Sequence, residues 1–375
     1  MIPFGITAPG RILFGRGQAA KAGEIIRSYG RRILVVHGST SDRATWLSIP
    51  DVEGVQAYHC YGEPTLAMLH EALYYTSAFE PEVVVAIGGG SVIDLGKALA
   101  ALIPAPDGPM QHLEVVGKGL PLVAAPLPFI AIPTTAGTGA EVTRNAVIGL
   151  PEHGRKVSLR DERMVARVAI VDPALTDGCP RAVTLASGLD AIAQVIEPYV
   201  SNKATPYTDA LARPAIGQGM AALMRLMEAE DPDARDRLAW VSLCGGLALS
   251  NGGLGAVHGL AGVIGGVTGA AHGAICGALL GPVLAANLAA ATGEARLRLV
   301  EVCEILAGVL GGTAATVPVR LQDWAGAAGL PGLAALGVST DMHAEIVTAS
   351  LTASSMKGNP VPLDRRSLQQ VLDAA

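Results

Sequence analysis

The sequence has little charge. Only 16% of its 375 residues are Asp, Glu, Lys or Arg, the formal net charge is −6, and no run of basic residues occurs. Proteins that bind nucleic acid cluster Lys and Arg to neutralise phosphates. We therefore expect no nucleic-acid partner.

Cysteine is also scarce, and no two cysteines form a C-x-x-C pair. The five are Cys60, Cys179, Cys244, Cys276 and Cys303. This spacing gives neither a zinc knuckle nor a disulfide framework, and it is typical of a reducing compartment. We expect a cytoplasmic protein whose cysteines are small buried hydrophobic residues.

Two hydrophobic features could suggest a membrane or secretion. The N-terminal residues MIPFGITAPGRILFG have no basic segment before an apolar one, so we expect no signal peptide. Residues 238–293 contain no Asp, Glu, Lys or Arg, but glycines interrupt them throughout, and two histidines and two asparagines occur there. We interpret this stretch as buried helices that line a site, with no membrane partner.

The length exceeds the usual size of a single core, so we expect two domains. Apolar runs predict strands at residues 32–36, 55–58, 83–87, 129–133, 155–159 and 168–171, the last two paired with each other. Beyond residue 180 strand signals vanish and Ala- and Leu-rich helical periodicity takes over. The fold class is therefore an α/β N-terminal dinucleotide-binding domain, residues 1–179, followed by an all-α C-terminal domain, residues 180–375.

Residues 81–100, PEVVVAIGGGSVIDLGKALA, predict a strand, a turn and a helix. The glycines Gly88, Gly89 and Gly90 allow a tight turn and the close approach of a ligand. Ser91 then opens a helix whose free N–H groups favour an anion, which we expect to be a diphosphate. The run matches neither the Walker A loop nor G-x-G-x-x-G, and a βα turn without a ligand is the alternative.

Small and polar residues follow two other strands. Strand 129–133 leads into TTAGTGAE, where hydroxyls and glycines suit hydrogen bonding to phosphate and nicotinamide amide groups. Strand 32–36 lacks the acid that usually binds ribose hydroxyls. Instead, Gly38 and Ser39 leave room for a 2′-phosphate, and Arg43 is near enough to pair with one or is a solvated surface charge.

Three segments together resemble the iron-containing, or group III, alcohol dehydrogenases. They are GGGSVIDLGKA at 88–98, IPTTAGTGAEVTRNAVI at 132–148 and SGLDAIAQVIEPYVSNKATPYTDALA at 187–212. The resemblance continues through HGLAGVIGGVTGAAHGAICGALL at 258–280 and SSMKGNPVPL at 354–363, and so covers nearly the whole chain. It implies a dehydroquinate synthase-like architecture, with NAD(P)(H) and a divalent metal, Fe²⁺ or Zn²⁺, between the domains, and a homo-oligomer, expected to be a homodimer.

The resemblance also implies the residues that bind the cofactor. Gly89, Gly90 and Ser91 would hold the diphosphate, with Asp94 and Lys97 on the helix beneath them. Thr134, Thr135 and Thr138 would contact phosphate or nicotinamide groups. Lys156 would lie at the cofactor site, and Leu175 would form an apolar wall of the adenine pocket. With Gly38 and Ser39, the expected cofactor-binding residues are Gly89, Gly90, Ser91, Asp94, Thr134, Thr135, Thr138, Lys156 and Leu175.

The metal ligands implied by the resemblance are Asp190, Gln194, His258 and His272. Asp190 and Gln194 lie one turn apart on a predicted helix, with Glu197 nearby. The family usually has histidine at position 194, and a further histidine where this chain has Gly262. An amide oxygen is a poorer ligand than imidazole for iron or zinc. Asp190, His258 and His272 still resemble a catalytic zinc site with three protein ligands. Two core histidines without metal are the alternative.

The expected function is a metal-dependent, NAD(P)-linked alcohol dehydrogenase that also works as an aldehyde or ketone reductase. Asp190, His258 and His272 are the expected catalytic residues, and their metal acts as a Lewis acid. The segment that carries both histidines has no Arg or Lys, which favours a small neutral alcohol or aldehyde.

Three alternatives stay open. A metal-independent reductase of the maleylacetate reductase type fits the weakened metal site, with Arg144, Lys203 and Lys357 available for an acidic substrate. A dehydroquinate-synthase-like lyase shares the two-domain plan but needs a cluster of basic groups for a phosphate. A non-catalytic nucleotide-binding protein would explain Gln194 and Gly262.

Overall fold

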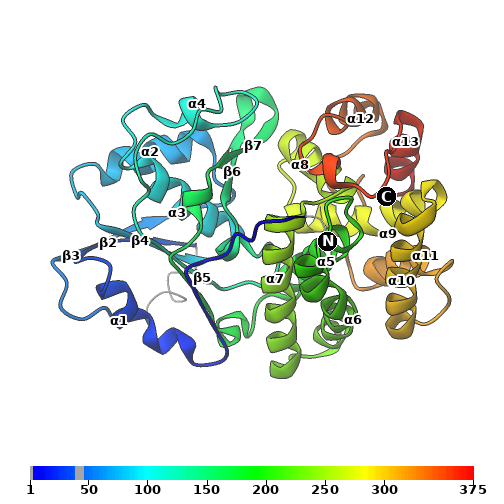
Figure 1. Cartoon of the computed structure of the whole chain (residues 1–375), viewed down its shortest axis with the longest axis horizontal. Helices are drawn as coiled ribbons and strands as arrows, with labels where there is room; N and C mark the ends of the chain where they lie inside the picture. The colour runs from blue at the N-terminus through cyan, green and yellow to red at the C-terminus, as the bar shows by residue number, and fades with distance from the viewer. Residues whose placement is uncertain (1–2, 39–45) are drawn as a thin grey trace. The chain divides into compact units, whose positions relative to one another are not determined.

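The computed structural model describes residues 3–38 and 46–375 (Figure 1). Its contacts group the chain into two compact units. The α/β unit comprises Thr7–Thr135 and Gly139–Asp177, and the helical unit contains Gly178–Ala375 together with Ala136–Thr138. An N-terminal parallel sheet with helices and an all-helical C-terminal part confirm the fold class predicted from the sequence.

Six parallel strands form the sheet of the α/β unit, in the order β1-β8-β5-β4-β2-β3. Their bounds are β1 (Arg11–Phe14), β2 (Arg32–His37), β3 (Gly54–His59), β4 (Val83–Gly88), β5 (Phe129–Pro133) and β8 (Val168–Val171). All residues of β4, β5 and β8 are buried, as expected of strands covered on both faces. The strand order reverses between β2 and β4, because β3 lies beyond β2 on one side and β5 beyond β4 on the other.

Helices cover both faces of this sheet. They are α1 (Ala22–Arg27), α2 (Leu66–Thr76), α3 (Gly90–Leu102) and α4 (Pro109–His112). Single-turn helices are η1 (Gln18–Lys21), η3 (Ala140–Val142), η4 (Pro151–His153), η5 (Glu162–Met164) and η6 (Pro173–Thr176). Alternate residues of each strand enter two separate cores: Val84 and Ala86 of β4 pack with α2 and α3, whereas Val83 and Val85 pack with α1.

One strand pairing predicted from the sequence is wrong. Residues 155–159 lie in β7 (Arg155–Arg160), which pairs antiparallel with β6 (Asn145–Leu150) in a separate hairpin. β8 instead pairs in parallel with β1 and β5. The physical reason is burial, since β7 alternates between exposed and buried positions, as in a half-covered hairpin, while β8 is buried throughout. Gly154, at a φ of 56°, makes the turn of the hairpin.

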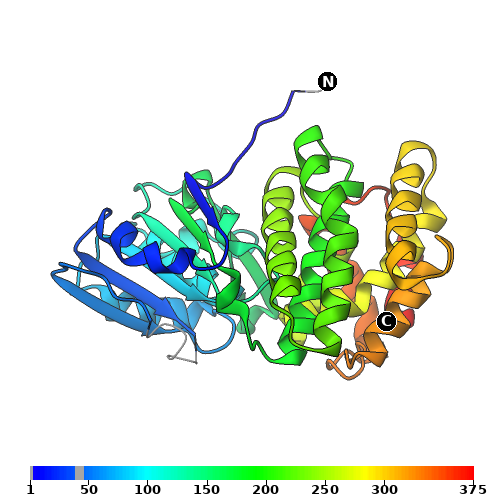
Figure 2. The same cartoon turned by 90° about the horizontal axis from the view of Figure 1, so that it is seen from below.

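The helical unit contains nine α-helices, and none of its described residues is in a strand. They are α5 (Arg181–Val200), α6 (Pro206–Glu228), α7 (Pro232–Gly252), α8 (Ala256–Thr268), α9 (His272–Ala290), α10 (Gly293–Leu310), α11 (Val317–Ala327), α12 (His343–Ser350) and α13 (Arg365–Ala374), with the short turns η7 (Thr340–Met342) and η8 (Ser355–Gly358). Figure 2 shows α5, α6 and α7, in green, packed side by side, as their contacts require. Thr205 caps α6 and Asp231 caps α7 through side-chain oxygens.

By length and composition, α9 could span a membrane, and so could α7 with α8 if that pair, bent by 98°, formed one span. In the structure 67% of the apolar window of α9 is buried, and the helix packs against α5 and α11. A core helix of a globular unit can be equally long and apolar, and α9 is buried as a core helix is.

Candidate metal and cofactor sites

Helix α5 carries three buried polar side chains on one face. Asp190, Gln194 and Glu197 follow one another at intervals of four and three residues, which places them along one side of the helix. Their exposed fractions are 1%, 2% and 4%. Buried polar groups normally have partners, and those of Asp190 and Glu197 come from α8 and α9.

Both histidines lie at the start of a helix. His258 is in the first turn of α8, and His272 is the first residue of α9, after Gly269 ends α8 at a φ of 68°. A Cβ on Gly273 would come within 2.5 Å of the carbonyl oxygen of Ala186. Glycine at 273 therefore lets the first turn of α9 approach α5 closely enough for His272 to reach Asp190.

The two imidazoles meet the Asp190 carboxylate. Nε2 of His258 lies 3.2 Å from Oδ1 of Asp190, and Nε2 of His272 lies 4.0 Å from the same oxygen. Cys276, one turn further along α9, brings Sγ to 3.6 Å from Nε2 of His272. One potential ligand atom from each of these four residues lies within 4.8 Å of every other. The predicted residues Asp190, His258 and His272 thus come together. Cys276, which the sequence did not predict as a ligand, lies in the same cluster.

Glu197 orients His258 from the other side of the ring. Its Oε2 lies 2.6 Å from Nδ1 of His258, and its Oε1 accepts the backbone N–H of Val257 at 2.7 Å. When Nδ1 donates to a carboxylate, Nε2 on the opposite side of the ring faces Asp190 and can bind a cation once it has lost its proton. This is the arrangement that commonly supports a histidine that binds a metal.

The electrostatics of the cluster favour a cation. Burial raises the pKa of Asp190, but hydrogen bonds and charge from His258 and His272 outweigh it and bring the pKa to about 2. Burial lowers the pKa of His272, whereas Cys276 and Asp190 raise it, to about 9 in sum. The pKa of His258 is likewise raised well above its usual value despite burial, through Cys276, Glu197 and Asp190. The two imidazoles therefore hold protons that a divalent cation would displace.

Gln194 also belongs to the cluster. Its side chain helps to lower the pKa of the Asp190 carboxyl. The amide oxygen Oε1 is buried and has no hydrogen-bond partner among the described residues. An unpaired buried acceptor is costly, which fits a site that binds a cation. Two imidazoles, a carboxylate and a thiol are donors suited to zinc and its neighbours among the transition metals.

Position 262, where the resemblance implies another histidine, is open in the structure. Gly262 lies one turn after His258 on α8, hence on the same side of the helix. A Cβ built on Gly262 would meet no described atom within 4 Å. The cluster therefore has no titratable side chain at this position.

The predicted cofactor residues of the α/β unit gather at one edge of the sheet. Gly38 follows β2, Gly89 follows β4, and Thr134 follows β5 and donates its N–H to the carbonyl of Gly88 at 2.9 Å. A Cβ on Gly89 would lie 3.3 Å from Oγ1 of Thr135. Gly90 and Ser91 form the first turn of α3, whose N-cap, Gly89, has no side chain to satisfy the free N–H groups. Dinucleotides bind at such a reversal of strand order, here between β2 and β4.

Asp94 and Lys97 of α3 bind groups in the segment 140–147. Oδ2 of Asp94 accepts the backbone N–H of Val147 at 3.0 Å. Nζ of Lys97 is fully buried and donates to Thr143 Oγ1 and to the carbonyls of Ala140 and Asn145, at 2.7–2.8 Å. Burial raises the pKa of Asp94 and lowers that of Lys97. The pair fastens η3 and β6 to α3.

The other predicted cofactor residues have different surroundings or lie outside the described residues. Lys156, on β7, has Nζ 2.6 Å from Oε2 of Glu63. Leu175, in η6 after β8, packs on the core that contains Val83 and Val85. Thr138 is grouped with the helical unit. Ser39 and Arg43 lie outside the described residues.

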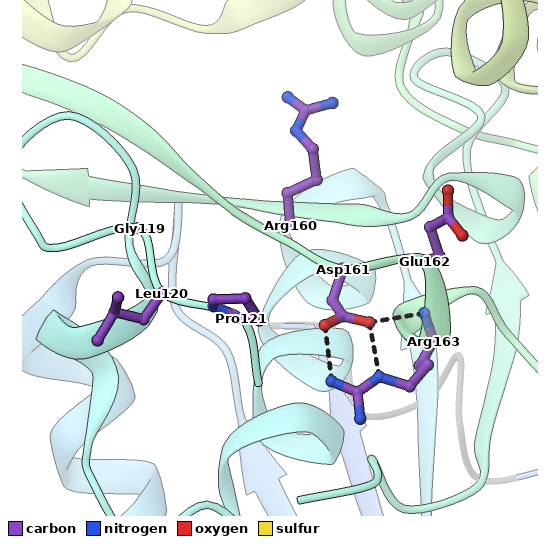
Figure 3. Close-up of a pocket in the computed structure, with 7 residues that line it drawn as sticks. All are labelled: Gly119, Leu120, Pro121, Arg160, Asp161, Glu162 and Arg163. Atoms are coloured by element: carbon purple, nitrogen blue, oxygen red, sulfur yellow. Dashed lines mark hydrogen bonds and ion pairs between the residues drawn. The ribbon is translucent and has the colours of Figure 1, made fainter. Parts of the chain in front are cut away.

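A surface cavity of about 440 Å³ lies elsewhere in the α/β unit (Figure 3). Its lining residues are Gly119, Leu120, Pro121, Arg160, Asp161, Glu162 and Arg163. The charges there are paired, since Arg163 donates twice to Asp161, Arg160 pairs with Glu114, and Glu162 pairs with Arg144. It includes none of the predicted site residues.

Comparison with known proteins gives one consistent result. The family described as iron-containing alcohol dehydrogenase matches residues 9–173, and the C-terminal family of the Fe-containing alcohol dehydrogenases matches residues 184–375. These two matches cover both units of the structure.

Individual relatives have related names. The probable alcohol dehydrogenase EutG of Escherichia coli is 34% identical over 68% of this chain and 66% of its own length, just under two thirds of that relative. The NAD-dependent methanol dehydrogenase of Bacillus methanolicus is 32% identical over 68% of this chain and 69% of its own. The solved structure of an alcohol dehydrogenase from Oenococcus oeni superposes with a TM-score of 0.87 at 26% identity, over 100% of both chains.

Proposed function

Because this chain belongs to the iron-containing alcohol dehydrogenase family, we propose that it is a metal-dependent, NAD(P)-linked oxidoreductase acting on CH–OH groups. It would interconvert a small alcohol and its aldehyde or ketone. The observation that carries the proposal is the convergence of Asp190, His258 and His272, with ligand atoms within 4.8 Å of one another and Glu197 behind His258.

Each residue of the cluster has a definable task. Asp190 supplies a buried carboxylate with a lowered pKa, so it stays ionised at neutral pH. His258 and His272 present Nε2 to that carboxylate. A divalent cation held there supplies Lewis acidity that polarises a carbonyl or hydroxyl oxygen. Asp190 and His258 are buried, and removal from water strengthens their electrostatic interactions.

The α/β unit would bind the nicotinamide cofactor. The free N–H groups at the start of α3 favour the diphosphate, and Gly89 allows its close approach. Thr134 and Thr135 stand at the end of the neighbouring strand, with hydroxyls available to phosphate or amide groups. NAD is supported by the name of a relative, that of the methanol dehydrogenase, and NADP by the absence of an acid at Gly38.

We propose a small neutral substrate, because neither α8 nor α9 contains Arg or Lys. The open position at Gly262 leaves room beside His258 for a side chain of the substrate. We further propose a cytoplasmic, homo-oligomeric enzyme, and the buried state of all five cysteines is compatible with a reducing compartment.

A metal-independent reductase of an acidic substrate is the second candidate, and Gln194 is the observation that favours it. Of the basic residues available for a carboxylate substrate, Arg144 is paired with Glu162, which weakens this alternative.

Oxidation of NADH and NADPH should be followed with a panel of neutral aldehydes and ketones and with a dicarboxylate ketone. The protein should be assayed as purified, after chelation, and after reloading with Zn²⁺ or Fe²⁺. We expect reduction of a neutral carbonyl that is lost on chelation and regained with metal. Reduction of the acidic substrate alone, unaffected by chelation, would favour the second candidate, and no turnover with any substrate would contradict both.

A further inference from the structure

Helix α9 presents two potential ligands to the same point. His272 and Cys276 are four residues apart, hence one above the other on the helix. Cys276 has an exposed fraction of 0%, and its Sγ lies 3.6 Å from Nε2 of His272. The thiol thus lies within the cluster of Asp190, His258 and His272 and not merely beside it.

The other cysteines have no such surroundings. Cys60, Cys179, Cys244 and Cys303 are buried too. Among the residues that the structure describes, no other group of three or more His, Cys, Asp or Glu gathers its ligand atoms this closely. Burial alone is therefore the ordinary state of a cysteine in this chain, and the convergence with two imidazoles and a carboxylate is particular to Cys276.

Gln194 competes for the same role but is the weaker donor. Its side chain helps to lower the pKa of the Asp190 carboxyl, and the atom that it could offer to a metal, Oε1, is a neutral amide oxygen. A thiolate carries a full charge and is a soft ligand, so zinc binds it in preference to a neutral amide oxygen.

We infer that Cys276 is the fourth protein ligand of the metal, in the role that the histidine usual at position 194 would have, and that the site prefers Zn²⁺ to Fe²⁺. The inference rests on the proposed function, since it concerns the same metal. Binding deprotonates the thiol, and the proton leaves to solvent as the sulfur–metal bond forms. No electron is transferred.

The test uses Co²⁺ as a spectroscopic probe of the chelated full-length protein. A cysteine thiolate bound to Co²⁺ gives a near-ultraviolet charge-transfer band, whereas oxygen and nitrogen ligands give only visible d–d bands. We expect the band in the wild type, in the matched control Cys303→Ala and in Gln194→Ala. We expect no band in Cys276→Ala, together with a loss of Zn²⁺ affinity of at least about tenfold, the effect of removing even supporting groups.

Zn²⁺ and Fe²⁺ supplied together in equal amounts test the preference. We expect the wild type to retain mainly zinc, and Cys276→Ser to lose much of that selectivity. Equal retention of both metals by the wild type would overturn the stated preference.

The outcomes separate this inference from the proposed function. Visible d–d bands without the charge-transfer band in the wild type would overturn the role of Cys276 while leaving a metal-dependent enzyme. Failure of the wild type to bind Co²⁺ or Zn²⁺ at all would overturn both. If Cys276→Ala does not fold, X-ray absorption of the zinc-loaded wild type decides. A sulfur scatterer at about 2.3 Å is expected, and a shell of only nitrogen and oxygen would contradict the inference.

Discussion

The Glu197 carboxylate lies 2.6 Å from Nδ1 of His258 and at the same time accepts the N–H of Val257. One side chain of α5 thus fixes both the ring of His258 and the first turn of α8. The ring nitrogen that remains, Nε2, faces Asp190 at 3.2 Å. The position of Nε2 of His258 in the cluster with Asp190 and His272 therefore depends on a residue outside that cluster.

Replacing Glu197 by glutamine should weaken metal binding by about 10–100-fold, the usual effect of losing a carboxylate behind a metal-binding histidine. The amide still fills the space but removes the negative charge that makes His258 a stronger ligand. Competition with a chromophoric zinc chelator measures the affinity. Glu162→Gln, at an exposed ion pair with Arg144, is the matched control and should have no effect. An unchanged affinity in Glu197→Gln would show that the contact is only structural.

Replacing Gln194 by histidine should raise the affinity for Fe²⁺ by at least about tenfold, because imidazole is a better ligand than an amide for this metal. Gly245 of α7 gives the side chain room, since it packs directly against the Cβ of Gln194. The iron retained after dialysis at a fixed free concentration measures the gain. Gln194→Asn, which shortens the amide, is the control without a new donor. If histidine gave no more iron than asparagine, position 194 would not face the metal.

Replacing Gly38 by aspartate should select NADH over NADPH. A Cβ there would lie 3.5 Å from Cγ2 of Val92, an ordinary contact, so the described residues accept a Cβ at this position. The new carboxylate would accept from the ribose hydroxyls of NAD and repel a 2′-phosphate. Fluorescence titrations should show NADPH binding weakened at least about tenfold. Gly38→Ser, uncharged, should leave the ratio of the two affinities unchanged. A ratio unchanged in Gly38→Asp would place the ribose away from β2.

Glu141 should make stability depend on pH. Burial raises its pKa to about 7, against the opposing effects of a backbone hydrogen bond and of Lys97. Its protonated form is favoured in the folded state, so the stabilisation is full below the unfolded pKa of about 4.5 and is lost as pH rises through about 7.

The variant Glu141→Gln removes this titration. We expect it to be as stable as the wild type near pH 4.5 and more stable at pH 8, by up to about 3 kcal/mol. Thermal unfolding between these pH values measures the difference, with exposed Glu152→Gln as control. A difference that did not change with pH would contradict the buried state of Glu141.

The sequence predicted those elements whose signal is local. The apolar run Val83–Ile87 and the glycines after it predicted β4 and the turn before α3, and helical periodicity predicted the helical unit. The pairing of β7 failed because hairpin β6–β7 depends on the turn at Gly154, whereas β8 is drawn into the sheet by burial between β1 and β5.

The resemblance to a known family predicted the centre of the site but not the residues around it. The resemblance implies Asp190, His258 and His272, which come together in the structure. The sequence shows Glu197 only as a neighbour of Gln194 on one helix. Its bond to His258 joins two helices distant in sequence, which no local pattern reveals. Cys276 belongs to no C-x-x-C pair, so the spacing of the cysteines does not reveal it. The spacing H-x-x-x-C from His272 was the signal that could have found it.

Hydride transfer from the nicotinamide to the substrate carbon tests the proposed function most directly. NAD(P)H with deuterium at both hydrogen positions of nicotinamide C4 should be incubated with a neutral aldehyde and the chelated or zinc-reloaded protein, and the alcohol analysed by mass spectrometry. We predict deuterium on the carbinol carbon with the reloaded protein and essentially none with the chelated protein. An alcohol without deuterium, or equal transfer by the metal-free protein, would contradict a metal-dependent oxidoreductase built on Asp190, His258 and His272.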